Sequence, residues 1–186
     1  MGIVHTKAYT IARRFKKYKE VYGVEVGVFR GRNASNLFKL IPNLHLVLVD
    51  RWEPYEYDSE GVEKIDAELC KDLNAFKYHL NNKINKETAL KILEKYKDRI
   101  EVYDMDSVEA SKLVKNKYDF VFIDGDHAYE SVKRDIEAWK DKVKSGGYLC
   151  GHDYGCSGFP GVKKAVDEHF PDAEIDKRNT WFVKYE

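Results

Sequence analysis

The sequence predicts an α/β fold in which a doubly wound, mostly parallel sheet carries helices on both faces. Short apolar runs alternate with longer amphipathic segments, and the runs are apolar at nearly every position instead of every second one. Strands of that composition are buried on both sides, as in parallel sheets covered by crossover helices. The predicted strands are residues 22–29, 45–50, 100–106, 118–124, 148–153 and 180–185.

The segments between these runs carry residues that begin and end helices. Residues 33–41 follow a glycine turn, and Asn33 or Ser35 can cap the first amides. Residues 127–147 have apolar side chains at helical spacing as far as Val143 and end in Gly-Gly. The predicted helices are residues 8–19, 33–41, 63–81, 86–97, 127–147 and 159–170.

Composition and charge exclude several classes of protein. The chain has 186 residues, enough for one buried core, and we expect a single domain with a helical insertion over 53–98. Because 32 basic residues balance 32 acidic ones, no overall positive field favours nucleic acid or an anionic membrane. No apolar run reaches the roughly 18 residues of a membrane span. The cysteines are three, without a C-x-x-C pair, which indicates reduced thiols and a cytoplasmic protein.

Polar residues recur where the predicted strands end. Right-handed crossovers place the carboxyl ends of parallel strands along one edge of the sheet, and ligands bind at that edge near the topological switch point. A long loop beside such an edge usually covers or selects a substrate, which is the role we expect for the insertion. The polar strand ends are Gly27–Gly31, Asp50, Asp104–Ser107, Asp124–His127 and His152–Tyr154.

The segment VEVGVFRG joins the first predicted strand to a helix through Gly27 and Gly31. Glycines let the backbone approach a ligand, and the free amides of the next helix attract negative charge. A dinucleotide fingerprint G-x-G-x-x-G is absent, which favours a smaller ligand with one carboxylate over NAD. Asp50 lies about 20 residues further on, where nucleotide-binding sheets place the acid that accepts hydrogen bonds from ribose.

Several motifs together carry a family resemblance. They are E-V-G-V-F-R-G, V-D-R-W, Y-D-F-V-F-I-D-G-D-H-A-Y-E, D-I-E-A-W, G-G-Y-L-C-G-H-D-Y and G-V-K-K-A-V. The chain resembles class I S-adenosylmethionine-dependent methyltransferases, and within them the macrocin O-methyltransferase-like subgroup, which is similar in layout to catechol O-methyltransferase. The resemblance is strong over 118–153 and absent over 53–98. It implies a Rossmann-like, seven-stranded sheet whose last strand, 180–185, is antiparallel.

The resemblance also implies roles for the polar strand ends. S-adenosylmethionine would be the cofactor, and a small hydroxylated molecule would be the methyl acceptor. His127 would be the general base, and Asp124 and Asp153 would hold a magnesium ion. This chain has His-Asp-Tyr at 152–154 where catechol-type enzymes carry an acid–amide pair, so metal use stays open. The implied cofactor contacts are Glu25, Gly27, Gly31 and Asn33 around the methionine part, Asp50 at the ribose, Met105, Asp106 and Ser107 at the adenine, and Asp124 at the methionine amino group.

The residue types leave structural alternatives beside these roles. His127 can cap its helix instead of acting in catalysis. His152 can bind zinc with Cys150 or Cys156, although the sequence offers no third ligand nearby. Trp52 can stack on adenine or pack against the insertion.

Other functions also remain open at this point. One is a non-catalytic protein that binds S-adenosylmethionine or a nucleoside, and another is a nucleotide-dependent oxidoreductase. A third is a methyltransferase that acts on RNA or protein. The neutral charge of the chain and the lack of an N/D-P-P-Y motif disfavour a nucleic-acid acceptor. The sequence predicts no membrane partner, and it leaves the oligomeric state open, a homo-oligomer included.

Overall fold

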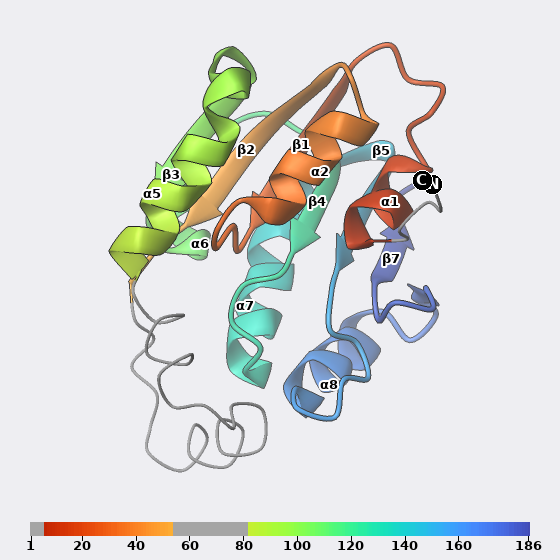
Figure 1. Ribbon diagram of the computed structural model, residues 1–186. Coiled ribbons are helices and arrows are strands. Elements are labelled where there is room, and N and C mark those ends of the chain that lie inside the picture. Colours follow the sequence, from red (N-terminus) through yellow and green to blue (C-terminus); the bar gives the residue numbers. More distant parts are fainter. Residues whose placement is uncertain (1–5, 54–81) are drawn as a thin grey trace.

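A seven-stranded sheet passes through the middle of the protein (Figure 1). The structure is a computed structural model that describes residues 6–53 and 82–186. Within these residues the strand order is β3-β2-β1-β4-β5-β7-β6. The strands are β1 (Val21–Val26), β2 (Leu44–Asp50), β3 (Ile100–Asp104), β4 (Tyr118–Ile123), β5 (Val143–Gly151), β6 (Glu174–Ile175) and β7 (Trp181–Lys184).

The pairing of the strands confirms the predicted sheet. Strands β1 to β5 pair in parallel, whereas β7 runs antiparallel to β5 and β6 antiparallel to β7. The fold is therefore Rossmann-like and mostly parallel, with an antiparallel last strand. The predicted helix 63–81 lies outside the described residues.

Helices form a layer on each face of the sheet (Figure 1). Two clusters of buried side chains define the layers: α1, α2 and α5 cover one face, and α6, α7 and α8 cover the other. The helices are α1 (Lys7–Ala12), α2 (Arg32–Leu40), α5 (Asn82–Leu93), α6 (Ser107–Leu113), α7 (Tyr129–Trp139) and α8 (Pro160–His169), with 3-10 turns η1 (Glu94–Arg99) and η2 (Lys140–Lys142).

Strand β4 explains why the central runs are apolar throughout. Each of its six residues is buried. Phe120 and Phe122 pack in the cluster with α1 and α2, whereas Val121 and Ile123 pack in the cluster with α7 and α8. Successive side chains of a strand point to opposite faces, so a sheet covered on both faces needs apolar residues at every position.

The N-terminal helix is shorter than the predicted 8–19, because α1 ends at Ala12. Beyond it, Phe15 leaves the helical path and packs in the core, where its ring lies 5.4 Å from that of Phe120. The basic residues that follow have no apolar stripe with which to continue a helix on the sheet. The second insertion helix also differs from the predicted 86–97, since α5 spans Asn82–Leu93 and a 3-10 turn follows.

Strand β5 begins earlier than predicted, at Val143 rather than at residue 148. The Gly-Gly pair that we interpreted as a helix end lies inside this strand, and α7 ends at Trp139. Gly146 has a left-handed φ of 78°, and the pairing with β4 shifts register between Tyr118 and Phe120. The glycines therefore form a bulge in β5, which local sequence did not distinguish from a helix cap.

Strands β1 and β4 are neighbours at the centre of the sheet, and their connections leave in opposite directions, toward β2 and toward β5. Open α/β sheets bind ligands at such a switch point. Gly27 directly follows β1 and has a φ of 86°. A Cβ atom there would lie 2.1 Å from the carbonyl oxygen of Asp124. The two strand ends thus approach so closely that only glycine fits.

Gly27→Ala should destabilise the protein more than Gly146→Ala. Both positions have a left-handed φ that strains alanine, but nothing lies within 4 Å of a Cβ at Gly146. We expect Gly27→Ala to lower the free energy of unfolding by about 1–3 kcal/mol more than the control, as overpacking does. Urea denaturation measures both losses, and equal losses would contradict the close approach of β1 and β4.

Candidate active site

A cavity of about 430 Å³ lies at the carboxyl ends of β1 and β2, between the start of α6 and one side of α7. Its walls include side chains of both charges, among them Arg134 and Asp135 of α7. Its volume is within the range of small-molecule sites. Five residues predicted to contact a cofactor line it: Gly27, Asp50, Met105, Asp106 and Ser107.

Asp50 holds the turn that follows β1. Its Oδ2 accepts hydrogen bonds from the backbone N–H groups of Val28 and Phe29, both at 2.8 Å, and its Oδ1 accepts one from Trp52 at 2.8 Å. Burial raises the pKa of Asp50, although the three N–H bonds oppose that shift. Each carboxylate oxygen has further lone pairs, so Asp50 can hold the turn and still accept a bond from a ligand.

Trp52 packs into the core with residues of α5, which agrees with the alternative that it packs against the insertion. Its ring is 7% exposed, and its Nε1 donates to the carbonyl oxygen of Phe29 at 2.8 Å. Gly31 is likewise used for packing and does not line the cavity. A Cβ atom at Gly31 would lie 3.1 Å from the Cα of Ala89, so the glycine lets α5 approach the start of α2.

Glu25 and Asn33 form a buried pair behind the glycine turn. The Asn33 amide donates to Glu25 Oε1 at 3.2 Å, and Glu25 is only 1% exposed. Burial raises the pKa of Glu25 to about 8. Within the described part of the chain, Glu25 Oε2 and Asn33 Oδ1 are buried acceptors without a hydrogen-bond partner. Such orphaned acceptors are costly unless a ligand or water donates to them.

The α6–α7 side of the cavity contains a buried acid that the sequence reasoning missed. Asp135 is 5% exposed, and burial raises its pKa to about 7 while a hydrogen bond with Ser107 opposes the shift. The Ser107 hydroxyl also accepts the indole N–H of Trp139 at 2.8 Å. The signal was present, because Asp135 interrupts the otherwise apolar stripe of α7. Asp106 caps α6 by accepting the N–H of Val108 at 2.9 Å.

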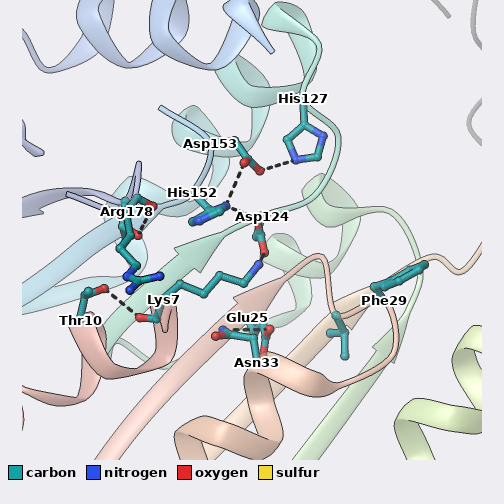
Figure 2. A network of polar contacts seen from close by, with 12 residues as sticks. Lys7, Thr10, Glu25, Phe29, Asn33, Asp124, His127, His152, Asp153 and Arg178 are labelled. Atoms are coloured by element: carbon teal, nitrogen blue, oxygen red, sulfur yellow. Dashed lines mark hydrogen bonds and ion pairs between the residues drawn. The ribbon is translucent and has the colours of Figure 1, made fainter. Parts of the chain in front are cut away.

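A series of alternating basic and acidic side chains lies at the carboxyl ends of β4 and β5 (Figure 2). Lys7, from α1, pairs with Asp124 Oδ2. His152 Nδ1 lies 3.7 Å from Asp124 Oδ1 and 3.0 Å from Asp153 Oδ1. His127 Nε2 lies 3.0 Å from Asp153 Oδ2. Each oxygen of the two carboxylates therefore has one basic neighbour.

Asp153 lies between the two histidines of this series. Its φ of 60° is left-handed, which a non-glycine residue adopts only where the surroundings hold it. Burial raises its pKa, but hydrogen bonds from His127 and His152 outweigh that effect and hold the pKa well below its usual range. The His127 ring also stacks on Phe159 with the ring centroids 4.0 Å apart, so two contacts fix its orientation.

Asp124 is buried at the end of β4. Burial raises its pKa, while attraction to the Lys7 ammonium acts against the shift. The same attraction raises the pKa of Lys7, although burial alone would lower it. The sequence reasoning missed Lys7, because a lysine in a short N-terminal helix carries no local signal of a partner 117 residues away.

The structure places two potential metal ligands, Asp124 and Asp153, beside His152. Asp124, His152 and Asp153 each offer one ligand atom, and these atoms all lie within 4.8 Å of one another. The zinc alternative with Cys150 is wrong, because Cys150 is fully buried in the sheet and its thiol donates to the carbonyl oxygen of Val121. Asp124 and Asp153, the predicted metal ligands, thus lie together with an imidazole between them.

The comparisons with known proteins agree with this geometry. Residues 24–154 match the family model of a methyltransferase domain. The chain belongs to this methyltransferase family. That match includes the glycine turn, Asp50 and the whole segment from Asp124 to Asp153. No curated protein matches the chain.

Solved structures share the fold at low sequence identity. The O-methyltransferase NovP is 18% identical with a TM-score of 0.67, over 96% of this chain and 77% of that one. CalS11, a TDP-rhamnose 3'-O-methyltransferase of calicheamicin biosynthesis, is 15% identical with a TM-score of 0.60, over 96% and 76%. An rRNA methylase from Streptococcus thermophilus is 12% identical with a TM-score of 0.61, over the full length of both chains. Fold alone therefore does not select the acceptor. None of the described helices is long and apolar enough to cross a membrane.

Glu25 should make the stability of the protein depend on pH. Its pKa is about 8 in the folded protein and about 4.5 in an unfolded chain, so wild-type stability falls as the pH rises through that interval. We expect Glu25→Gln, which does not ionise, to remove about 2–4 kcal/mol of the loss in unfolding free energy between pH 5 and pH 8.

Urea denaturation at the two pH values measures this effect. Asp135→Asn is a second variant for the same measurement, because burial also raises the pKa of Asp135 and its replacement should remove a separate loss of the same sign. An unchanged pH dependence in Glu25→Gln would show that the buried carboxyl is not the source.

Proposed function

We propose that this methyltransferase transfers the methyl group of S-adenosylmethionine to a hydroxyl oxygen of a small-molecule acceptor. One observation carries the proposal: His127, oriented by Asp153 and by the ring of Phe159, follows directly on Gly125 and Asp126 of the cavity wall. Transfer to oxygen requires that the acceptor lose a proton, and a fixed imidazole is suited to take it near neutral pH.

The residues around the glycine turn fit S-adenosylmethionine. The unpartnered acceptors Glu25 Oε2 and Asn33 Oδ1 would receive N–H bonds from its amino group, as would Asp124. Asp50 would accept hydrogen bonds from the ribose, and Met105, Asp106 and Ser107 would line the adenine. When bound, the cofactor supplies an electrophilic methyl group on a sulfonium.

In the proposed mechanism, Nε2 of His127 carries the proton and donates it in a hydrogen bond to Asp153. Oδ2 of Asp153 lies 3.0 Å from Nε2 and accepts that bond, which leaves Nδ1 to take the proton of the acceptor hydroxyl. Asp153 then stabilises the imidazolium that forms, as a buried carboxylate does beside a catalytic histidine. Its lowered pKa keeps it ionised for this purpose.

A second cavity, of about 920 Å³, lies beside His152. Tyr9 and Thr10 of α1 form one wall, and residues 174–179 form the other. His152 belongs to this wall and also contacts Asp153, so the acidic cluster lies between the two cavities. The lining of this cavity includes His152 but not His127, so we do not assign to it the acceptor hydroxyl that His127 would deprotonate.

The donor atoms of Asp124, His152 and Asp153 also fit a divalent cation. A bound cation lowers the pKa of a coordinated hydroxyl group and so assists its deprotonation. The two carboxylates suit magnesium, the ion that the resemblance implies, whereas the imidazole does not.

Asp50→Ala should weaken binding of S-adenosylhomocysteine. Loss of a hydrogen bond between a ribose hydroxyl and a charged acceptor costs about 1.5–3 kcal/mol, or roughly tenfold to a hundredfold in affinity. Isothermal titration calorimetry measures the affinity. Asp176→Ala is the matched control, since Asp176 also accepts a loop N–H, from Arg178 at 3.0 Å, but lines the second cavity. Wild-type affinity in Asp50→Ala would contradict the assigned cofactor site.

His127→Ala should reduce turnover by about a hundredfold or more, the usual contribution of a general base. S-Adenosylhomocysteine should still bind within about threefold of wild type, because His127 acts on the acceptor. Transfer of a labelled methyl group to hydroxylated small molecules, with RNA and protein as parallel substrates, measures turnover. His169→Ala, on α8, serves as control.

Each outcome of this assay has a defined meaning. Full activity in His127→Ala would remove the proposed base. Transfer to RNA or protein alone would correct the acceptor class. Tight binding of the cofactor without transfer to any substrate would favour a non-catalytic binding protein.

A further inference from the structure

We propose that Asp124, His152 and Asp153 form a site for a divalent transition-metal ion, such as Mn²⁺ or Co²⁺, in preference to Mg²⁺. This inference concerns the identity of the ion and goes beyond the proposed methyl transfer, which needs only the cofactor and the base. It depends on His152, which supplies the nitrogen donor among the three residues.

The three ligand atoms already lie near metal-binding positions. His152 Nδ1 is 3.0 Å from Asp153 Oδ1 and 3.7 Å from Asp124 Oδ1, and all three atoms lie within 4.8 Å of one another. Metal bonds of about 2.1 Å separate adjacent ligand atoms by about 3.0–3.4 Å, so small side-chain movements would complete the site. A hydrogen bond to Asp153 alone would not require the second carboxylate to face the same ring nitrogen.

The backbone holds these residues in place. Asp124 follows β4 and His152 follows β5, and the two strands pair through Ile123 and Gly151. The N–H of His152 donates to the carbonyl oxygen of Ile123 at 3.1 Å. The left-handed φ of Asp153 turns its carboxylate back beside the imidazole. A site built on two paired strand ends keeps its geometry better than one on a free loop.

The side chains are shielded but reachable. The exposed fractions are 10% for Asp124, 24% for His152 and 17% for Asp153. His152 also lines the second cavity, which gives an ion a path from solvent. Lys7 binds Oδ2 of Asp124 and leaves Oδ1 on the side of His152. The ammonium therefore lies beside the proposed ion without occupying its ligand positions, and it repels the ion.

The donor set determines the preference among ions. Mg²⁺ takes oxygen ligands in a nearly ideal octahedron, whereas imidazole suits transition-metal ions, and the affinity of a given nitrogen and oxygen site rises from Mn²⁺ through Co²⁺ to Ni²⁺. Two carboxylates balance the double positive charge, and three protein ligands leave positions open for a hydroxyl or water. Replacement of His152 by an acid would give an all-oxygen set.

The first experiment titrates chelator-treated protein with Mn²⁺, Co²⁺ and Mg²⁺ by calorimetry, without cofactor or acceptor. We expect one Mn²⁺ or Co²⁺ per chain and an affinity for Mg²⁺ about a hundredfold weaker or less. Pulsed electron paramagnetic resonance of bound Mn²⁺ should show coupling to one imidazole nitrogen. These readouts do not depend on turnover.

Variants then separate metal binding from a structural role of His152. His152→Glu should abolish the nitrogen coupling and reduce the ratio of Mn²⁺ to Mg²⁺ affinity by at least about tenfold. His152→Gln, which is neutral, is the second variant in case the extra carboxylate disturbs the fold. Lys7→Met should tighten Mn²⁺ binding by about threefold or more, because it removes the neighbouring charge. His169→Ala should change nothing.

Three results would each overturn the proposal: no binding of Mn²⁺ or Co²⁺, equal affinity for Mg²⁺ and Mn²⁺, or nitrogen coupling that persists in His152→Glu. None of them bears on the proposed function, because binding of S-adenosylhomocysteine to the metal-free protein tests that separately. Binding of Mn²⁺ by a protein that does not bind S-adenosylhomocysteine would support the metal proposal and contradict the proposed function.

Discussion

The close approach of β1 and β4 at their carboxyl ends is the constraint on which the rest of the site depends. At Gly27 the two backbones leave no room for a Cβ atom, so Asp124 at the end of β4 lies directly beside the turn that follows β1. The connections leave this point in opposite directions, and the divergence opens the cavity at the carboxyl ends of β1 and β2. Asp50, at the end of β2, then fixes the turn by accepting two backbone hydrogen bonds, from Val28 and Phe29.

The parallel, doubly covered character of the sheet followed from a simple property of the sequence. Runs such as 120–123 are apolar at successive positions, as a strand buried on both faces requires, and the structure contains a strand at each of the six predicted places. The errors lie where local signals are ambiguous. Gly146 and Gly147 end a helical pattern as a cap would, yet the long-range pairing of β5 with β4 makes them a bulge. The two-residue strand β6 has no pattern of its own and exists through pairing with β7.

The candidate site was predictable wherever it follows a strand end. The edge of a parallel sheet is known once its strands are, so Asp50, Asp106 and Asp124 could be located without coordinates. Lys7 and the role of Gly31 could not, because each depends on a helix that packs from elsewhere in the chain. His152 had no role in the predicted site, since strand alternation places it on one face with Cys150 without a third ligand, whereas the backbone turns after Gly151 and brings it to Asp124.

Several buried polar groups in this site lower the stability of the folded protein when no ligand is bound. Glu25 and Asp135 are buried acids with raised pKa values, and Glu25 Oε2 and Asn33 Oδ1 lack donors. A sequence selected for stability alone would replace such groups by apolar ones, as substitution of buried charges often stabilises proteins. Their retention beside a cavity is explained if a cationic, hydrogen-bond-donating ligand compensates them. Binding to the folded state alone then restores stability by an amount that rises with the logarithm of the ligand concentration above Kd. The loss of stability in the free protein and the affinity for such a ligand therefore have the same physical origin.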